Sequence, residues 1–171
     1  MAKIDETKTL HLSKKLIINL PIFMESAVKT LASFTNLETK KLSHEIKKFD
    51  ANLDGKHIIA IMQFSGDFDG SFILIFSNDI AILTLESLLG EKINPNDFNV
   101  LKDGVGEFCN IIMGSIKTAL SKEDINIIFE LPKTYISLRT VQDVILEENG
   151  VWVNMLLSKM PFYMFIGKAI A

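Results

Sequence analysis

The segment FNVLKDGVGEFCNIIMGSIKTAL, residues 98–120, has the apolar periodicity of one long amphipathic helix. At about 100° per residue, apolar side chains spaced three and four positions apart fall on a single stripe. This stripe consists of Phe98, Leu101, Val105, Phe108, Ile112, Ile116 and Ala119. We expect it to pack on a sheet, because a helix in a globular domain buries its apolar side. Pro95, Asn96 and Asp97 supply the helix start.

A second stripe of the same helix lies about 180° from the first and is polar. It is made of Asp103, Glu107, Asn110, Gly114 and Lys117, with Gly104 and Gly106 beside it. Glu107 and Asn110 are three positions apart and are therefore predicted to project side by side into solvent. Asparagine and glycine are poor helix formers, so helix stability gives no reason for them. Spacing leaves two interpretations open: a surface that another molecule approaches closely across the glycines, or an ordinary solvated helix side.

Two shorter helices are predicted in the first half of the chain. Apolar residues from Pro21 to Phe34 recur with helical spacing, and so do those from Ile80 to Leu89. We expect Asn78 or Asp79 to cap the second of these helices and Gly90 to end it.

Strands are predicted on both sides of the long helix. Before it, the apolar runs His57–Phe64 and Ser71–Phe76 flank the turn sequence SGDFDG and indicate a hairpin. Residues 36–50 are either a connection with some helix or an irregular strand, and the conformation of residues 36–56 is left open. The strands expected after the helix are Ile125–Leu131, Thr134–Leu138, Val144–Glu147, Val151–Leu157 and Phe162–Ile170.

These elements predict a two-layer α+β fold for residues 1–171 as a single domain. About three helices pack on a mostly antiparallel sheet of about six strands, because the late strands are joined by short loops. The polar residues 1–14 lack a signal-peptide core and form either a short ordered edge or a flexible N-terminal extension.

Composition narrows the class of partner and the compartment. The net charge of −3 offers no basic excess that would drive binding to nucleic acid or anionic lipid. The single cysteine, Cys109, excludes an internal disulfide and favours a reducing compartment, so we expect a cytoplasmic protein. Mean hydropathy is high, at +0.27, but the apolar segment Val151–Ala171 is interrupted by polar residues and proline and is interpreted as buried strands.

Other catalytic patterns receive little support from the sequence. GDFDGS, residues 66–71, superficially resembles the nucleophile loop of haloacid-dehalogenase phosphatases, with Asp67 as nucleophile and Asp69 as acid. In that family the nucleophile ends a parallel strand, whereas an apolar strand resumes here at Phe72, so a hairpin turn is favoured. Cys109 borders the buried stripe and is interpreted as a small core residue. The histidines show neither metal-binding nor triad spacing: His11, His44 and His57.

The long helix and the residues after it resemble the signature of the CheC/CheX/FliY family of chemotaxis phosphatases. The family motif is Glu-x-x-Asn followed about twenty residues later by proline, which corresponds here to Glu107, Asn110 and Pro132. The order of predicted elements is also similar, over most of the chain after about residue 15. In two-site members a helix of the first half repeats the pair, but Glu25 is followed three positions later by Val28. The chain is therefore similar to the single-site CheX branch.

The resemblance implies a CheC-like fold and a hydrolase that removes phosphate from the phospho-aspartate of a CheY-type response regulator. Such a regulator holds its own Mg²⁺ and lysine at the phosphoryl group, so this chain is expected to bind no metal or cofactor. The implied role of Asn110 is to orient the attacking water, and that of Glu107 is to pair with the regulator's lysine. The implied partner-binding residues are Asp103, Gly106, Gly114 and Lys117. Pro132 either supports the site or breaks a strand.

The resemblance also implies a homodimer that pairs subunits through sheet edges, for which the apolar C-terminal strand is the candidate. The alternative function is a non-catalytic module of the same fold that binds a response regulator or a flagellar-switch protein. The two functions differ in whether the pair Glu107 and Asn110 accelerates phosphate release.

Overall fold

The computed structural model describes residues 10–170 as an α+β fold, as predicted. The helices of this part are α1 (Lys14–Ile18), α2 (Leu20–Thr35), α3 (Asn78–Leu89), α4 (Phe98–Ser121) and α5 (Leu138–Val144). The strands are β1 (Thr39–Lys47), β2 (His57–Gly66), β3 (Gly70–Ser77), β4 (Ile127–Phe129), β5 (Lys133–Tyr135), β6 (Gly150–Leu157) and β7 (Met160–Gly167).

The strands form one sheet of seven strands in the order β1-β6-β7-β3-β2-β4, with β5 also paired to β2. Every pairing is antiparallel, which confirms the predicted strand directions. The predicted hairpin is present as β2 and β3. Strand β1 lies in the segment 36–50, for which an irregular strand was one of the two predicted alternatives, and its pairing to β6 shifts register between Lys41 and Ser43. Its side chains are largely exposed, so pairing to β6 holds it in the sheet without apolar alternation.

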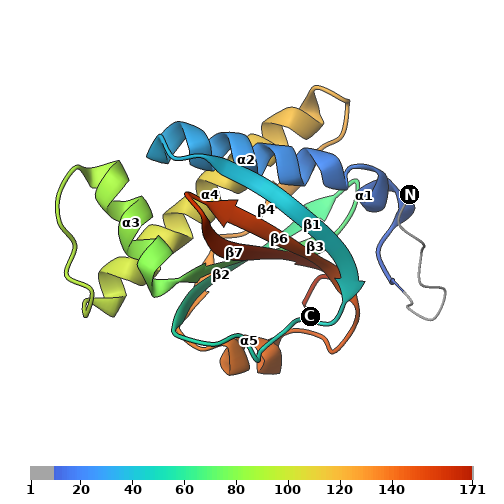
Figure 1. Cartoon of the computed structure of the whole chain (residues 1–171). Coiled ribbons are helices and arrows are strands. Elements are labelled where there is room, and N and C mark those ends of the chain that lie inside the picture. Colours follow the sequence, from blue (N-terminus) through green and yellow to red (C-terminus); the bar gives the residue numbers. More distant parts are fainter. Residues whose placement is uncertain (1–9, 171) are drawn as a thin grey trace.

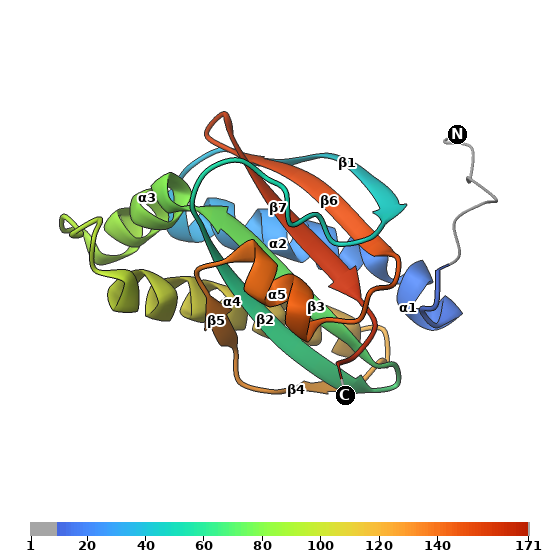
Figure 2. The ribbon, with the colours of Figure 1, turned by 90° about the horizontal axis from the view of Figure 1, so that it is seen from below.

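Helices cover both sides of the sheet unequally. Figure 1 shows α2 and α4 lying across one side, with α3 at their end, while α5 lies on the other. Figure 2, seen from below, places α5 in front of β2 and β3 and α4 behind them. The second side has its own buried cluster, made of Phe49, Ile59, Ile61, Ile73, Ile75, Leu138, Val141, Trp152 and Phe165. The two-layer prediction therefore holds for the main core and misses a small third layer.

The α5 helix corrects the predictions for residues 134–147. A strand was expected to reach Leu138 and another to cover Val144–Glu147, but β5 ends at Tyr135 and no strand forms at 144–147. The Ser137 hydroxyl accepts a hydrogen bond from the Thr140 N–H at 3.4 Å and so caps a helix. Leu138 and Val141, three positions apart, are both buried against the sheet. One helical turn seats both side chains, which a strand would point in opposite directions.

The ends of the predicted helices are set by local capping. Asp97, one of the three residues predicted to start the helix, caps α4, with its carboxylate accepting from the Val100 N–H at 3.3 Å. The cap of α3 is Ser77, one position before the predicted Asn78 or Asp79, and its hydroxyl accepts from the Ile80 N–H at 3.2 Å. Gly90 ends α3 in the left-handed conformation, with φ of 69°.

The N-terminal prediction is only partly covered by the structure, because residues 1–9 lie outside the described part. Within residues 10–14, Leu10 and Leu12 pack against the core, and Ser13 caps α1 through a hydrogen bond from the Leu16 N–H. This part of the segment is an ordered edge. In the described range 10–170, none of the helices combines the length and the apolar character that a membrane crossing needs.

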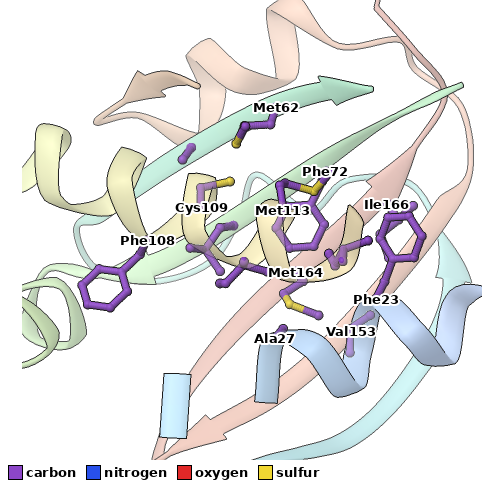
Figure 3. Close-up of a cluster of buried hydrophobic side chains, with 14 of the residues drawn as sticks. Phe23, Ala27, Met62, Phe72, Phe108, Cys109, Met113, Val153, Met164 and Ile166 are labelled. Atoms are coloured by element: carbon purple, nitrogen blue, oxygen red, sulfur yellow. The ribbon is translucent and has the colours of Figure 1, made fainter. Parts of the chain in front are cut away.

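The main core lies between α4, α2 and the sheet. Figure 3 shows Cys109 and Met113 of α4 among side chains of the strands and of α2, including Met62, Phe72, Phe23 and Ala27. All of these side chains are fully buried and belong to one hydrophobic cluster, which also includes Phe108 of α4. Because α4 is anchored along its length by this cluster, its opposite side is held in a fixed orientation toward the outside.

Candidate functional site

The two stripes predicted for α4 are present. Five of the seven apolar positions are fully buried, namely Leu101, Val105, Phe108, Ile112 and Ile116, while Phe98 and Ala119 are half-buried. The buried side is wider than predicted, because it also includes Gly106, Cys109, Met113 and Leu120. At about 100° per residue these four positions fall on one flank of the apolar stripe, where Gly106 meets Thr134 of β5.

Glu107 and Asn110 reach the surface from the polar stripe, as predicted. The Glu107 side chain is exposed and that of Asn110 is half-buried. Neither forms a hydrogen bond or an ion pair with any other residue between positions 10 and 170. An amide with both donors and an acceptor free, next to a free carboxylate, can bind a polar group from outside the chain.

Asp103, Asn110 and Lys117 form a nearly straight row along α4. Seven residues turn the helix by about 700°, which is only about 20° short of two full turns. Adjacent members of the row are therefore about 10 Å apart along the axis, at 1.5 Å per residue. Asp103 and Lys117 are exposed. The row thus presents a carboxylate, an amide and an ammonium in sequence.

The segment Phe129–Pro132, which links β4 to β5, runs beside this row and is called the edge segment below. One end of it contacts α4 at Lys117, whose Nζ lies 5.7 Å from the centroid of the Phe129 ring. The other end contacts α4 at Gly106, where a β-carbon would lie 3.6 Å from Pro132 Cγ. The two chains are antiparallel between these contacts, and Asn110 lies between positions 106 and 117. The edge segment therefore runs along the part of α4 that carries Asn110.

The three glycines of α4 have different environments. A β-carbon at Gly104 would lie 2.1 Å from Leu85 Cδ2 of α3, so this glycine permits close helix packing. Gly106 is buried, and a β-carbon there would meet Thr134 Cγ2 at 3.2 Å. Only Gly114 has open space, with nothing within 4 Å of an added β-carbon. Gly106, predicted as a partner-binding residue, is instead covered by Pro132 and Thr134 of its own chain.

Pro132 has a structural contact with the site. It is half-buried and packs on Gly106, directly before Glu107 on α4. Of its two predicted roles, the contact favours support of the site. Phe129 was not identified from the sequence, because no periodicity links an aromatic residue to a lysine twelve positions earlier on another element.

The other sequence patterns have structural explanations. Asp67 and Asp69 lie in the turn between β2 and β3, and the Asp67 carboxylate accepts a hydrogen bond from the Asn126 N–H at 2.8 Å. Cys109 is fully buried, and burial raises the pKa of its thiol well above the ordinary range. Over residues 10–170, His, Cys, Asp and Glu side chains form no group of three that could hold a metal ion.

A cavity of about 330 Å³ lies on the opposite side of the sheet from α4. Its walls include Ile61 of the cluster under α5, and Tyr135 and Ile170, which pack against that cluster. Glu130 and Leu131 of the edge segment also line it. The cavity and the pair Glu107 and Asn110 are thus separated by the sheet edge.

The α2 helix carries no second copy of the pair. Glu25 is exposed, but the position three residues later is the half-buried Val28. An apolar branched side chain cannot replace the hydrogen-bonding amide. The described helices therefore hold one such pair, on α4.

The chain matches the family model described as "Chemotaxis phosphatase CheX" over residues 58–155, a range that includes β3, α3, α4, the edge segment and all of β2 except its first residue. No curated protein matches it.

Solved structures of similar fold cover almost the whole chain. A chemotaxis protein CheX from Desulfovibrio desulfuricans is 18% identical, with a TM-score of 0.72 over 89% of this chain and 99% of that chain. CheX in a CheX–CheY–BeF3–Mg complex from Borrelia burgdorferi is 19% identical, with a TM-score of 0.69 over 87% of this chain and 96% of that chain. FliY from Thermotoga maritima is 19% identical, with a TM-score of 0.67 over 94% of this chain and 93% of that chain. Because these sequence identities are low, the structural similarity shows a shared fold and no more than that.

Proposed function

The chain belongs to the chemotaxis phosphatase CheX family, and on this premise we propose that it hydrolyses the phospho-aspartate of a CheY-type response regulator. A role related to CheY is supported by the family and by the solved complex of a Borrelia burgdorferi CheX with CheY. The observation that carries the catalytic proposal is the free pair on α4. Glu107 and Asn110 project together from α4, and the opposite side of this helix is packed in the hydrophobic core.

The proposed reaction requires no nucleophile from this chain. Water attacks the phosphorus atom, the bond between phosphorus and the aspartyl oxygen breaks, and the products are the aspartate carboxylate and dihydrogen phosphate. An acyl phosphate is already reactive, and the regulator supplies Mg²⁺ and a lysine that offset charge on the phosphoryl group. The remaining requirement is to hold the water in line with the breaking bond.

Asn110 is proposed to hold that water. Its carboxamide offers an acceptor and two donors and keeps this pattern at any pH near neutrality, because it does not ionise. Glu107 is proposed to pair with the regulator's lysine and so to fix the docked position. Asp103, Gly114 and Lys117 are proposed to contact the regulator around this pair, and Pro132 to support it from inside.

The test is the rate of phosphate release from a purified CheY-type regulator phosphorylated with acetyl phosphate, at constant Mg²⁺. We expect the parent protein to accelerate release and Asn110→Ala to lose at least about a hundredfold of that acceleration, because small errors in positioning have effects of this size. Glu107→Ala should mainly raise KM. Glu25→Ala and Asn52→Ala, which change exposed residues outside α4 and the edge segment, are the matched controls.

The non-catalytic alternative gives a different result in the same assay. A binding module would bind the regulator and leave its phosphate release unchanged. Binding without acceleration by the folded parent protein would therefore rule out the phosphatase and leave the binding function.

The homodimer and the cytoplasmic location stay part of the proposal. The C-terminal strand cannot supply the dimer edge, because β7 lies between β6 and β3 inside the sheet. The outer edge of β1 is the long open edge, with Leu42 exposed, but lysines at positions 40, 41 and 47 oppose pairing of edges. Sedimentation of the parent and of Leu42→Lys would test whether a dimer forms through β1.

A further inference from the structure

We propose that Lys117, held against the ring of Phe129, is a second electrostatic anchor that receives an acidic side chain of the regulator and fixes the direction in which the regulator docks. This inference rests on the proposed function and adds a residue pair that acts on docking and not on the chemical step.

The first observation is the distribution of charge along α4. Asp103 and Glu107 lie before Asn110, and Lys117 lies after it. Glu107 and Lys117 are ten residues apart, or about 15 Å along the helix axis. This separation exceeds the Debye length of about 8 Å at physiological ionic strength, so a docked protein meets two separate charges of opposite sign. A regulator turned end for end would meet both with the wrong sign.

The second observation is that these three charged groups form no ion pair with any residue between positions 10 and 170. The ion pairs within residues 10–170 join other elements, and α4 contributes to none of them. Asp103, Glu107 and Lys117 are all exposed. Their charges are therefore available to a protein that covers this side of α4.

The third observation is that a side chain from another element holds Lys117. Its ammonium lies 5.7 Å from the centroid of the Phe129 ring, a distance at which the ring face attracts a cation. An exposed lysine otherwise samples many rotamers and loses that freedom on binding. Since the ring already restricts the side chain, less freedom is lost when an acidic group approaches.

The helix dipole does not account for this lysine. Favourable interaction of a cation with the dipole is confined to the last turn. The last turn of α4 contains no basic residue, and Lys117 lies four positions before the terminal Ser121. Its position corresponds instead to the row that contains Asp103 and Asn110.

The experiment measures KM and kcat for phosphate release by the full chain acting on a phosphorylated CheY-type regulator. For Lys117→Gln we expect KM to rise about two- to fivefold, the size typical of one exposed ion pair, with kcat unchanged. The rise should shrink as NaCl is increased from about 0.05 M to about 0.5 M, because salt screens the contact. Lys29→Gln removes an exposed lysine of α2 and is the charge-matched control.

Variants of Phe129 test the role of the ring. Phe129→Leu should raise KM by part of the Lys117→Gln effect, while Phe129→Tyr keeps an aromatic face and should retain the parent KM. In a double-mutant cycle, Phe129→Leu should cause no further rise in KM when Lys117→Gln is already present. Thermal unfolding of each variant confirms that it is folded before its KM is compared.

The inference is overturned if Lys117→Gln and Lys29→Gln have the same KM, or if Lys117→Gln lowers kcat at constant KM. If Asn110→Ala still abolishes the acceleration of hydrolysis, either result rules out Lys117 as an anchor and leaves the proposed function intact. If the parent protein does not accelerate phosphate release, both this inference and the proposed function are wrong.

Discussion

The ring of Pro132 lies directly on Gly106: a β-carbon at position 106 would come within 3.6 Å of Pro132 Cγ. The edge segment thus approaches α4 at a position that has no side chain, one helical turn before Asn110. This contact fixes the separation between the helix and the sheet edge on the side where the amide emerges. It connects the proline of the motif to the pair Glu107 and Asn110 through packing.

Pro132→Ala is expected to lower kcat for phosphate release severalfold while reducing the free energy of unfolding by less than about 1.5 kcal/mol, because it loosens one partly buried contact. Steady-state kinetics and urea unfolding measure the two effects. Pro161→Ala, at an exposed position of β7, is the control. Equal kcat for both variants would show that the contact does not position the site.

Gly114→Ala is expected to increase the free energy of unfolding by up to about 1 kcal/mol, because the added methyl meets no atoms and alanine favours the helix. Gly114→Leu should also stay folded, yet its larger side chain should raise KM by obstructing the approach of the regulator. Thermal unfolding and kinetics separate the two consequences. A leucine variant with parental KM would place the docked regulator away from Gly114.

Gly104→Ala is expected to have the opposite effect on stability. Its β-carbon would lie 2.1 Å from Leu85 Cδ2, and this buried leucine has to move. Overpacking of this kind typically costs about 1–3 kcal/mol, more than the helix propensity gained. Urea unfolding of Gly104→Ala, Leu85→Ala and the double variant should show strong non-additivity. Additive losses would mean that the two residues do not compete for the same space.

His57 is expected to make stability depend on pH below neutrality. Burial lowers the pKa of its imidazole from the ordinary value of 6.5, against a hydrogen bond to the Gly55 carbonyl that raises it. The unfolded state therefore binds the proton more tightly than the folded state, and stability falls as the pH drops below about 6.5 until the lower folded pKa is reached.

Urea midpoints between about pH 5.5 and pH 7.5 measure this slope. His57→Gln should reduce it, and His11→Gln, at an exposed position, should not. The slope should not vanish completely, since partial burial and Lys41 also lower the pKa of His44. An unchanged slope in His57→Gln would exclude His57 as its source.

Cys109 is expected to resist alkylation in the folded protein. Because burial raises the pKa of its thiol, little thiolate forms near pH 8, and the sulfur is inaccessible. Labelling with iodoacetamide should proceed at the rate of transient opening and become fast in denaturant. Rapid labelling of the native protein would mean that α4 does not stay packed beneath Asn110.

Much of this architecture follows from local patterns along the chain. The period of the apolar residues predicted α2, α4 and the β2–β3 hairpin, because one buried side of an element repeats at the spacing of its own geometry. Residues 39–47 and 138–144 did not follow such a pattern. The first is an exposed edge strand held by pairing to β6, and the second is a short helix fixed by its cap and two buried side chains.

The pair Glu107 and Asn110 was predictable from the sequence, since helical spacing alone places both residues opposite the apolar stripe of α4. The contacts of Pro132 with Gly106 and of Lys117 with Phe129 were not, because they join residues that no short-range period relates. They depend on where β2 holds the edge segment relative to the helix. The helix period thus specifies which side chains point outward, whereas long-range packing specifies what stands beside them.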